Sequence, residues 1–289
     1  MSATTSTLSA RDLEFAARAN ASARTPVLFV HGLWLHASSW DRWVELFEQA
    51  GYAAHAPGWP GDGATVAETR AHPERLAGVG VEQVTEHHRE LIRALHTAPV
   101  VVGHSFGGLV AQKLLGEGLA RAAVAVDPAQ MRGVLRLPLV QLWNALPVLG
   151  NPAQLGGTNF PSRERFARAF ASAVPRAESD EIHERWTIPA PGRPLFEAAA
   201  ANVLPGTPAA VRTGADRGPL LVVGGGQDRT VPAATTRAIA RRYHDGSSIT
   251  EYEEFADRGH SLVVDSGWRE VADYALQWLA FVGQPAGAA

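Results

Sequence analysis

A serine with one glycine two residues before it and another two residues after it is the segment of this sequence best suited to chemistry. Ser105 lies in Gly103-His104-Ser105-Phe106-Gly107, after the apolar run 99–102 and before a segment with the apolar spacing of a helix. A serine on a sharp turn from a strand to a helix needs small neighbours, and the following helix directs free N–H groups at the turn. The pattern predicts that Ser105 attacks a carbonyl carbon.

A nucleophilic serine needs a base, and the base needs an acid that orients it. Asp228 follows the apolar run 219–223 in a glycine-rich loop, and His260 follows the alternating run 249–255. Both residues come just after a predicted strand, as Ser105 does, and such ends meet at one edge of a parallel sheet. The predicted triad is therefore Ser105 as nucleophile, His260 as general base and Asp228 as the orienting acid.

Asp127 is an alternative position for the acid, because it also follows an apolar run, residues 122–126. We prefer Asp228. The histidine that precedes the serine, His104, is predicted to pack beside the turn, and His31 is predicted to be structural.

With these residues in place, the chain resembles the serine-dependent α/β-hydrolase-fold family of esterases, lipases and lactonases. Val30-His31-Gly32-Leu33 is similar to the oxyanion loop of that family, and the order serine, aspartate, histidine along the chain is the family's order. The resemblance implies that the backbone N–H groups of Leu33 and Phe106 form an oxyanion hole. It also implies hydrolysis of a carboxylic ester or lactone through an acyl-enzyme, as a carboxylesterase does.

Other activities on the same scaffold stay open. Carbon-carbon bond hydrolases, amidases, perhydrolases and hydroxynitrile lyases can use the same serine, and a small-molecule receptor on the hydrolase fold is an alternative of a different class. The complete set of serine, aspartate and histidine favours an enzyme, because binding alone does not need these three residues.

Predicted strands and helices alternate along most of the chain, which is typical of an α/β fold with a mainly parallel, doubly wound sheet. The predicted strands are residues 13–19, 27–30, 52–56, 100–102, 122–126, 220–223 and 249–254. Apolar residues at helical spacing predict further helices that follow Ser38 or Ser39 and that close the chain.

Residues 128–216 interrupt this alternation with prolines and short helical pieces. We therefore expect a hydrolase core of residues 1–127 and 217–289 and a mostly helical cap of residues 128–216, which would shield the site from water. The candidate substrate-binding residues are Trp34 and Trp59 on loops after strands and Trp143 and Trp186 in the cap. No cluster of cationic residues stands out in the cap or the loops, so an uncharged, fairly apolar small-molecule substrate is expected.

Composition excludes several other classes of function. The formal net charge of −3 and the lack of a basic cluster disfavour a nucleic-acid partner. No apolar run reaches the length of a membrane span and residues 1–25 lack a secretion signal, so a cytoplasmic protein with no membrane partner is expected. The chain has no cysteine and no His-Glu-x-x-His spacing. We therefore expect neither a bound metal nor another cofactor. No pattern indicates the oligomeric state.

Overall fold

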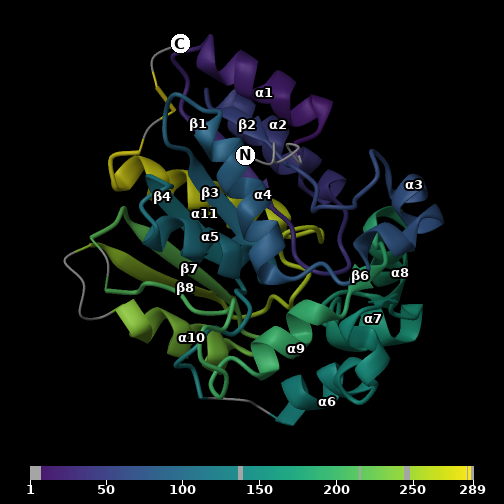
Figure 1. The fold of residues 1–289 in the computed structure, drawn as a ribbon. Helices are drawn as coiled ribbons and strands as arrows, with labels where there is room; N and C mark the ends of the chain where they lie inside the picture. The colour runs from purple at the N-terminus through teal and green to yellow at the C-terminus, as the bar shows by residue number, and fades with distance from the viewer. Residues whose placement is uncertain (1–7, 136–138, 215, 244–247, 285, 288–289) are drawn as a thin grey trace.

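The centre of the fold is a six-stranded sheet in which all neighbouring strands are parallel (Figure 1). This computed structural model describes residues 8–135, 139–214, 216–243, 248–284 and 286–287. The strands run in the order β2-β1-β3-β4-β7-β8 across the sheet. They are β1 (Pro26–Val30), β2 (Ala53–His55), β3 (Val100–His104), β4 (Ala122–Val126), β7 (Leu220–Gly225) and β8 (Thr250–Phe255). The predicted α/β fold with a parallel, doubly wound sheet is confirmed.

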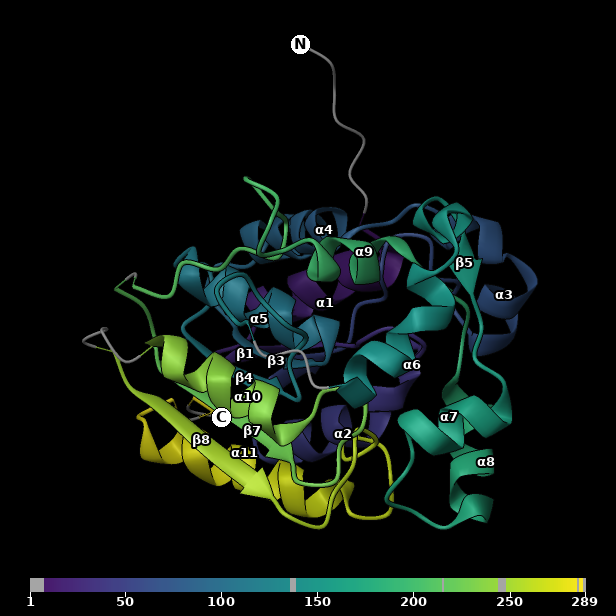
Figure 2. The same cartoon turned by 90° about the horizontal axis from the view of Figure 1, so that it is seen from below.

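Helices cover both faces of this sheet (Figure 2). One face carries α1 (Ala10–Asn20), α4 (Val81–Arg93), α5 (Phe106–Gly116) and α10 (Ala233–Ala240), and the other carries α2 (Asp41–Gln49) and α11 (Trp268–Phe281). Successive side chains of a strand point to opposite faces. In β1, Leu28 packs in the first layer and Phe29 in the second, so every position of the strand is buried. Coverage on both faces explains why the inner strands β1, β3, β4 and β7 read as apolar runs, whereas the edge strand β8 is only partly buried.

The expected strand at residues 13–19 is wrong, because this segment belongs to helix α1. Ser9 caps the helix: its hydroxyl accepts from the Asp12 N–H and the Asp12 carboxylate accepts from the Ser9 N–H. The buried residues Asp12, Phe15, Ala16 and Ala19 have the spacing of one helical face.

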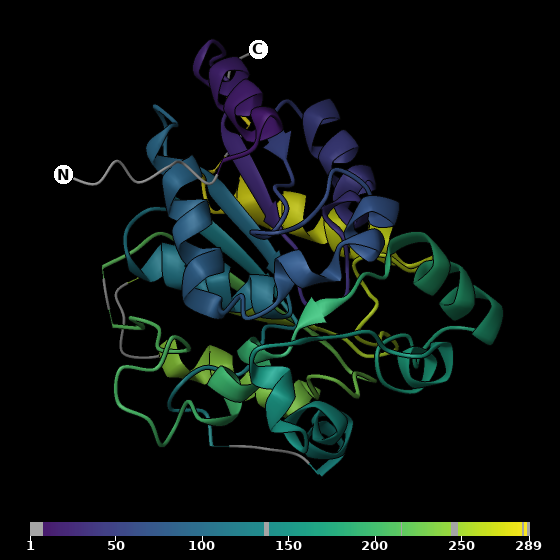
Figure 3. The same ribbon diagram turned by 45° about the vertical axis from the view of Figure 1, so that its right-hand side comes forward.

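The segment 128–216, here called the inserted segment, lies beyond one end of the strands (Figure 3). It contains α6 (Leu139–Leu149), α7 (Arg163–Ala169), α8 (Arg176–Trp186), α9 (Arg193–Ala199) and an antiparallel pair of short strands, β5 (Thr158–Asn159) and β6 (Ala190–Pro191). Residues 136–138 and 215 lie outside the described residues. The division into a core and a cap domain stays a prediction.

Short helical elements complete the chain. They are α3 (Val66–Ala71), η1 (Ala37–Trp40), η2 (Pro73–Leu76), η3 (Pro152–Leu155) and η4 (Arg241–Tyr243). The predicted helix after Ser38 or Ser39 corresponds to η1 and α2, and the hydrogen bond that caps η1 is accepted by the His36 side chain. Within the part of the chain that the structure describes, no helix combines the length and apolar character needed to cross a bilayer.

Candidate active site

Ser105 lies at the turn between β3 and α5 in a strained backbone conformation, with φ 55° and ψ −120°. The two glycines of the pentapeptide are required by close packing. A Cβ on Gly103 would lie 2.1 Å from the Gly107 carbonyl oxygen, and a Cβ on Gly107 would lie 2.0 Å from the Val30 carbonyl oxygen. The turn therefore depends on glycine at both positions, as the sequence pattern predicts.

Three residues other than glycine have a positive φ among the described residues: Ser105 and Asp127 directly follow β3 and β4, and Trp34 lies on the loop after β1. Trp34 has φ 68°, Ser105 has φ 55° and Asp127 has φ 41°. Such conformations are costly for non-glycine residues and concentrate at functional sites. This clustering points independently to the edge that holds Ser105.

His260 and Asp228 meet at the same edge. The His260 Nδ1 lies 2.5 Å from the Asp228 Oδ2, and the other Asp228 oxygen accepts from the backbone N–H groups of Thr230 at 2.6 Å and Val231 at 2.8 Å. The His104 Nε2 lies 2.9 Å from the His260 carbonyl oxygen, so His104 packs behind the turn as predicted. These contacts fix the position of the imidazole and of the carboxylate.

Burial governs the titration of this pair. It lowers the pKa of His260 to about 4, against the charge of Asp127, which raises it. It also raises the pKa of Asp228 to about 7, against hydrogen bonds from Asp127, Val231 and Thr230, which lower it. A neutral imidazole can accept a proton, which is the form that a general base needs.

Asp127, the alternative acid, is also buried beside the imidazole but further away. Its Oδ2 lies 3.8 Å from the His260 Nδ1, and its Oδ1 accepts a 2.8 Å hydrogen bond from the Gly225 N–H. Burial and the neighbouring Asp228 raise the pKa of Asp127 well above its ordinary value. The hydrogen bond of His260 therefore goes to Asp228, and burial favours the protonated form of Asp127.

Asp127, Asp228 and His260 are also a group of three possible metal ligands among the described residues. Ligand atoms bound to one ion at about 2.0–2.2 Å lie further apart than hydrogen-bonded atoms. The 2.5 Å separation of the Asp228 and His260 atoms therefore fits a shared proton and not an ion between them.

The remaining nitrogen of the imidazole, the His260 Nε2, is buried and makes no hydrogen bond to the described residues. The imidazole packs between the rings of His104 and Phe170, with centroids 4.5 Å and 4.8 Å away. Pairs of a nucleophile and a base are often looser without substrate than with it. The His260 Nε2 is therefore available to accept a proton.

The loop after β1 packs directly against Ser105. A Cβ on Gly32 would lie 2.6 Å from the Ser105 Cβ, so only glycine lets the loop approach so closely. The Leu33 backbone N–H makes no hydrogen bond within the described part of the chain, and Phe106 begins α5, so its N–H has no acceptor within the helix. These are the two N–H groups that the resemblance assigns to an oxyanion hole.

A buried pair that the sequence analysis missed supports this loop. The His31 Nε2 lies 3.0 Å from the Asp62 Oδ2, and both side chains are almost fully buried. The same carboxylate oxygen accepts from the Trp59 N–H, and the Trp59 indole donates to the His31 carbonyl. Asp62 stands between two glycines in the sequence and therefore reads as an ordinary turn residue.

The inserted segment is tied to the residues that follow the same loop. Ile188 donates its N–H to the Trp34 carbonyl and His36 donates its N–H to the Trp186 carbonyl, while Leu35 and Thr187 form an isolated β-bridge. The Trp34 indole donates to the Asn159 side chain at 2.7 Å. Both the backbone and a side chain thus connect the two parts of the chain.

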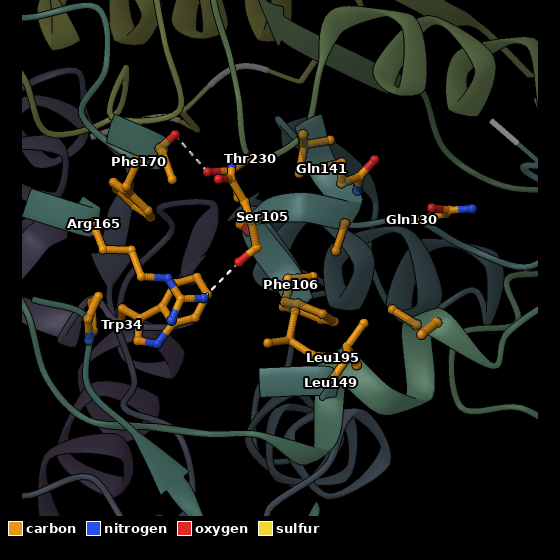
Figure 4. A pocket seen from close by; sticks show the side chains of 18 of the residues that line it. Trp34, Ser105, Phe106, Gln130, Gln141, Leu149, Arg165, Phe170, Leu195 and Thr230 are labelled. Atoms are coloured by element: carbon orange, nitrogen blue, oxygen red, sulfur yellow. Dashed lines mark hydrogen bonds between the residues drawn. The ribbon is translucent and has the colours of Figure 1, made fainter. Parts of the chain in front are cut away.

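A mostly apolar pocket opens at Ser105 (Figure 4). Its lining includes Ser105 and Phe106 from the turn and Trp34 from the loop after β1, and most of the remaining lining comes from the inserted segment. Among the lining side chains from that segment, Phe170 is apolar and Arg165 is charged. Arg165 escaped the sequence analysis because a single arginine on a short helix carries no signal.

The four tryptophans predicted to bind substrate occupy different surroundings. Trp34 lines the pocket, whereas the other three are not part of its described lining. Trp59 is buried beneath His31, and Trp186 packs against the guanidinium of Arg42. Trp143 is 74% exposed and lies on the outside of α6. The packing of Trp59 and Trp186 and the exposure of Trp143 explain their absence from the lining.

Comparisons with known proteins agree with the α/β fold described above. A model of the alpha/beta hydrolase family matches residues 27–274. A search of curated protein sequences finds no match.

Among solved structures, the fold is similar to a monoacylglycerol lipase from Paleococcus ferrophilus, with 20% identity and a TM-score of 0.61 over 89% of this chain and 95% of that one. It is similar to a thermophilic esterase from Thermogutta terrifontis, with 18% identity and a TM-score of 0.62 over 89% and 90% of the two chains. An enol-lactonase from Burkholderia xenovorans aligns with 16% identity and a TM-score of 0.62 over 91% and 92%. At these identities the likeness shows a shared fold.

Proposed function

Because this chain belongs to the alpha/beta hydrolase family, we propose that it is a serine hydrolase that cleaves a carboxylic ester or lactone through an acyl-enzyme. The observation that carries the proposal is the convergence at one sheet edge of a strained Ser105 and a hydrogen-bonded pair of His260 and Asp228. Their chain order is the order of serine hydrolases on this fold.

In the first step, the Ser105 hydroxyl attacks the carbonyl carbon and the His260 Nε2 takes its proton. Asp228 accepts a hydrogen bond from the His260 Nδ1, which leaves the lone pair on Nε2 free for that proton. The negative charge develops on the carbonyl oxygen, where the N–H groups of Leu33 and Phe106 would bind it. A donor in such a position contributes about 3–4 kcal/mol to transition-state stabilisation.

In the second step, His260 protonates the leaving alcohol, and a water molecule that His260 deprotonates then attacks the acyl-enzyme. Free acid and free Ser105 result. We propose that the inserted segment acts as a cap over this site, because it supplies much of the pocket lining. The apolar side chains of the pocket lining favour a substrate whose main part is apolar and uncharged. Arg165 is the charged exception in that lining.

The experiment that tests this proposal is turnover of 4-nitrophenyl esters of increasing acyl length, run with labelling by a fluorophosphonate. We expect turnover and labelling in the wild type, loss of both in Ser105→Ala, and wild-type behaviour in Ser22→Ala, which removes a distant hydroxyl on the surface. Labelling with a single turnover and slow product release would support a receptor instead. Full activity of folded Ser105→Ala would overturn the proposal.

A further inference from the structure

One cationic side chain lies in the mostly apolar lining described for the pocket. Arg165 belongs to α7, its side chain is half-buried, and Figure 4 shows it extending into the cavity that also contains Ser105 and Trp34. A charge at an apolar surface is costly unless a partner of opposite charge or several hydrogen bonds compensate it.

The protein itself supplies little of that compensation. The guanidinium donates from Nη2 to the Asn144 carbonyl oxygen at 2.7 Å, and no carboxylate of a described residue forms an ion pair with it, whereas Arg163 on the same helix pairs with Glu184. Burial, and then the like charge of Arg168, lower the pKa of Arg165, and no acidic residue opposes them. A guanidinium has five N–H donors, so most of them remain for a ligand.

The other polar side chains of the lining are uncharged, and none of the described lining residues carries a carboxylate. Gln130, Asn144 and Thr230 donate to the carbonyl oxygens of Val134, Arg229 and Ala169, the Trp34 indole donates to Asn159, and Gln141 accepts from Thr235. A partner of opposite charge for Arg165 in this pocket would therefore come with the ligand.

We propose that Arg165 binds a carboxylate of the substrate. The compounds cleaved would then be esters or lactones that also carry a free carboxylate on a short apolar chain. A guanidinium can bind a carboxylate through two parallel hydrogen bonds, so the interaction is selective for the planar carboxylate group and is also strengthened by the opposite charges. This inference rests on the proposed function. It differs from the expectation of a wholly uncharged substrate, because a single cationic side chain in the pocket can bind an anion even though the cap has no cationic cluster.

The test compares matched pairs of 4-nitrophenyl esters that differ by a terminal carboxylate, such as the hexanoate and the hydrogen adipate. Diacids from succinate to suberate cover the unknown distance between Ser105 and Arg165. The variants are Arg165→Gln, Arg165→Lys and the control Arg168→Gln, which removes the same charge from an exposed position on the same helix. Thermal unfolding confirms that each variant is folded.

We expect Arg165→Gln to lower kcat/KM for the best carboxylate-bearing ester by about 10- to 100-fold, the range of a lost charged hydrogen bond. The effect should fall mainly on KM, because the contact exists before and during the reaction. The neutral ester should change less than about 3-fold, as should both esters in Arg168→Gln. Arg165→Lys should recover part of the loss, since it keeps the charge without the planar fork.

A second readout separates failure of this inference from failure of the proposed function. Calorimetric binding of monomethyl adipate to Ser105→Ala, with and without Arg165→Gln, needs no turnover. If esters are cleaved and the ratio of anionic to neutral kcat/KM is unchanged in Arg165→Gln, the role of Arg165 is wrong and the hydrolase stands. If no ester is cleaved but monomethyl adipate binds only when Arg165 is present, the carboxylate site stands and the ester chemistry is wrong.

Discussion

Replacing Gly32 by alanine should separate the proposed oxyanion loop from the nucleophile. A Cβ at this position would lie 2.6 Å from the Ser105 Cβ, 3.0 Å from the His104 carbonyl oxygen and 3.3 Å from the Ser105 Oγ. Carbon atoms in contact normally lie about 3.5–4.0 Å apart, so the two segments must part by about 1 Å. Neither side can yield by rotating a flexible side chain, because a Cβ follows its backbone.

The catalytic cost follows from which atoms move. The Leu33 N–H directly follows Gly32, so a shift of the loop moves this donor away from the oxygen it would bind. A misplacement of about 1 Å can cost about 100-fold, and loss of a whole donor costs about 100- to 1,000-fold in kcat. We therefore expect kcat of Gly32→Ala to fall by about 100- to 1,000-fold, with an overpacking cost of about 1–3 kcal/mol in stability.

The assay is kcat and KM on the best 4-nitrophenyl ester, together with the rate of fluorophosphonate labelling, which should fall in parallel. Gly156→Ala is the matched control, because its Cβ would meet no atom within 4 Å. KM should change less than kcat, because most of the pocket lining comes from the inserted segment. If a folded Gly32→Ala protein keeps kcat within about 5-fold of the wild type, the loop does not bind the oxyanion as argued.

Three further predictions concern charge. Asp228→Asn should lower kcat by about 10,000-fold, because it favours the wrong imidazole tautomer, whereas Asp127→Asn should cost less than about 10-fold, since burial favours the uncharged form of Asp127, which asparagine resembles; equal losses would contradict this division of roles. Burial lowers the pKa of His260 to about 4 and raises that of Asp228 to about 7, so acidification should protonate the orienting carboxylate first and kcat/KM should decline from about pH 7 downward; a profile that stays flat down to pH 5 would contradict this. Burial raises the pKa of Asp12, but hydrogen bonds from His55 and Ser9 outweigh it and leave the value at about 2. The resulting stabilisation, about 2 kcal/mol, is present above pH 4 and is lost between pH 4 and pH 2; urea unfolding of Asp12→Asn should show this loss at pH 7 but not at pH 2.

The sequence was sufficient to predict the parts of the site where backbone packing restricts the residue type. Gly103 and Gly107 cannot carry a side chain in this turn, so the turn is visible as a pattern. Asp228 and His260 follow strands that are apolar or alternating, and parallel strands bring their carboxyl ends to one edge. The assignment of Ser105, Asp228 and His260 to a triad stays a prediction that the geometry supports.

The sequence was insufficient to predict features that depend on contacts between distant segments or on local capping. Residues 13–19 contain apolar residues at both helical and alternating positions, and the capping by Ser9 and Asp12 decides for a helix. Asp62 meets His31 only through the fold. Arg165 has a role only because α7 turns its side chain into the pocket. Local pattern carries no information on such pairings.

The hydrogen bonds between the inserted segment and the residues after β1 bear on how this protein could be redesigned. Exchanging the inserted segment for that of a relative keeps these bonds only if the new segment brings backbone groups to the positions of the Ile188 N–H and the Trp186 carbonyl. The Trp34 carbonyl belongs to the residue directly after Leu33, so loss of these bonds would alter the geometry of catalysis as well as the choice of substrate. A graft that transfers residues 34–36 together with the inserted segment would keep both partners of each hydrogen bond. It is therefore the exchange most compatible with retained turnover.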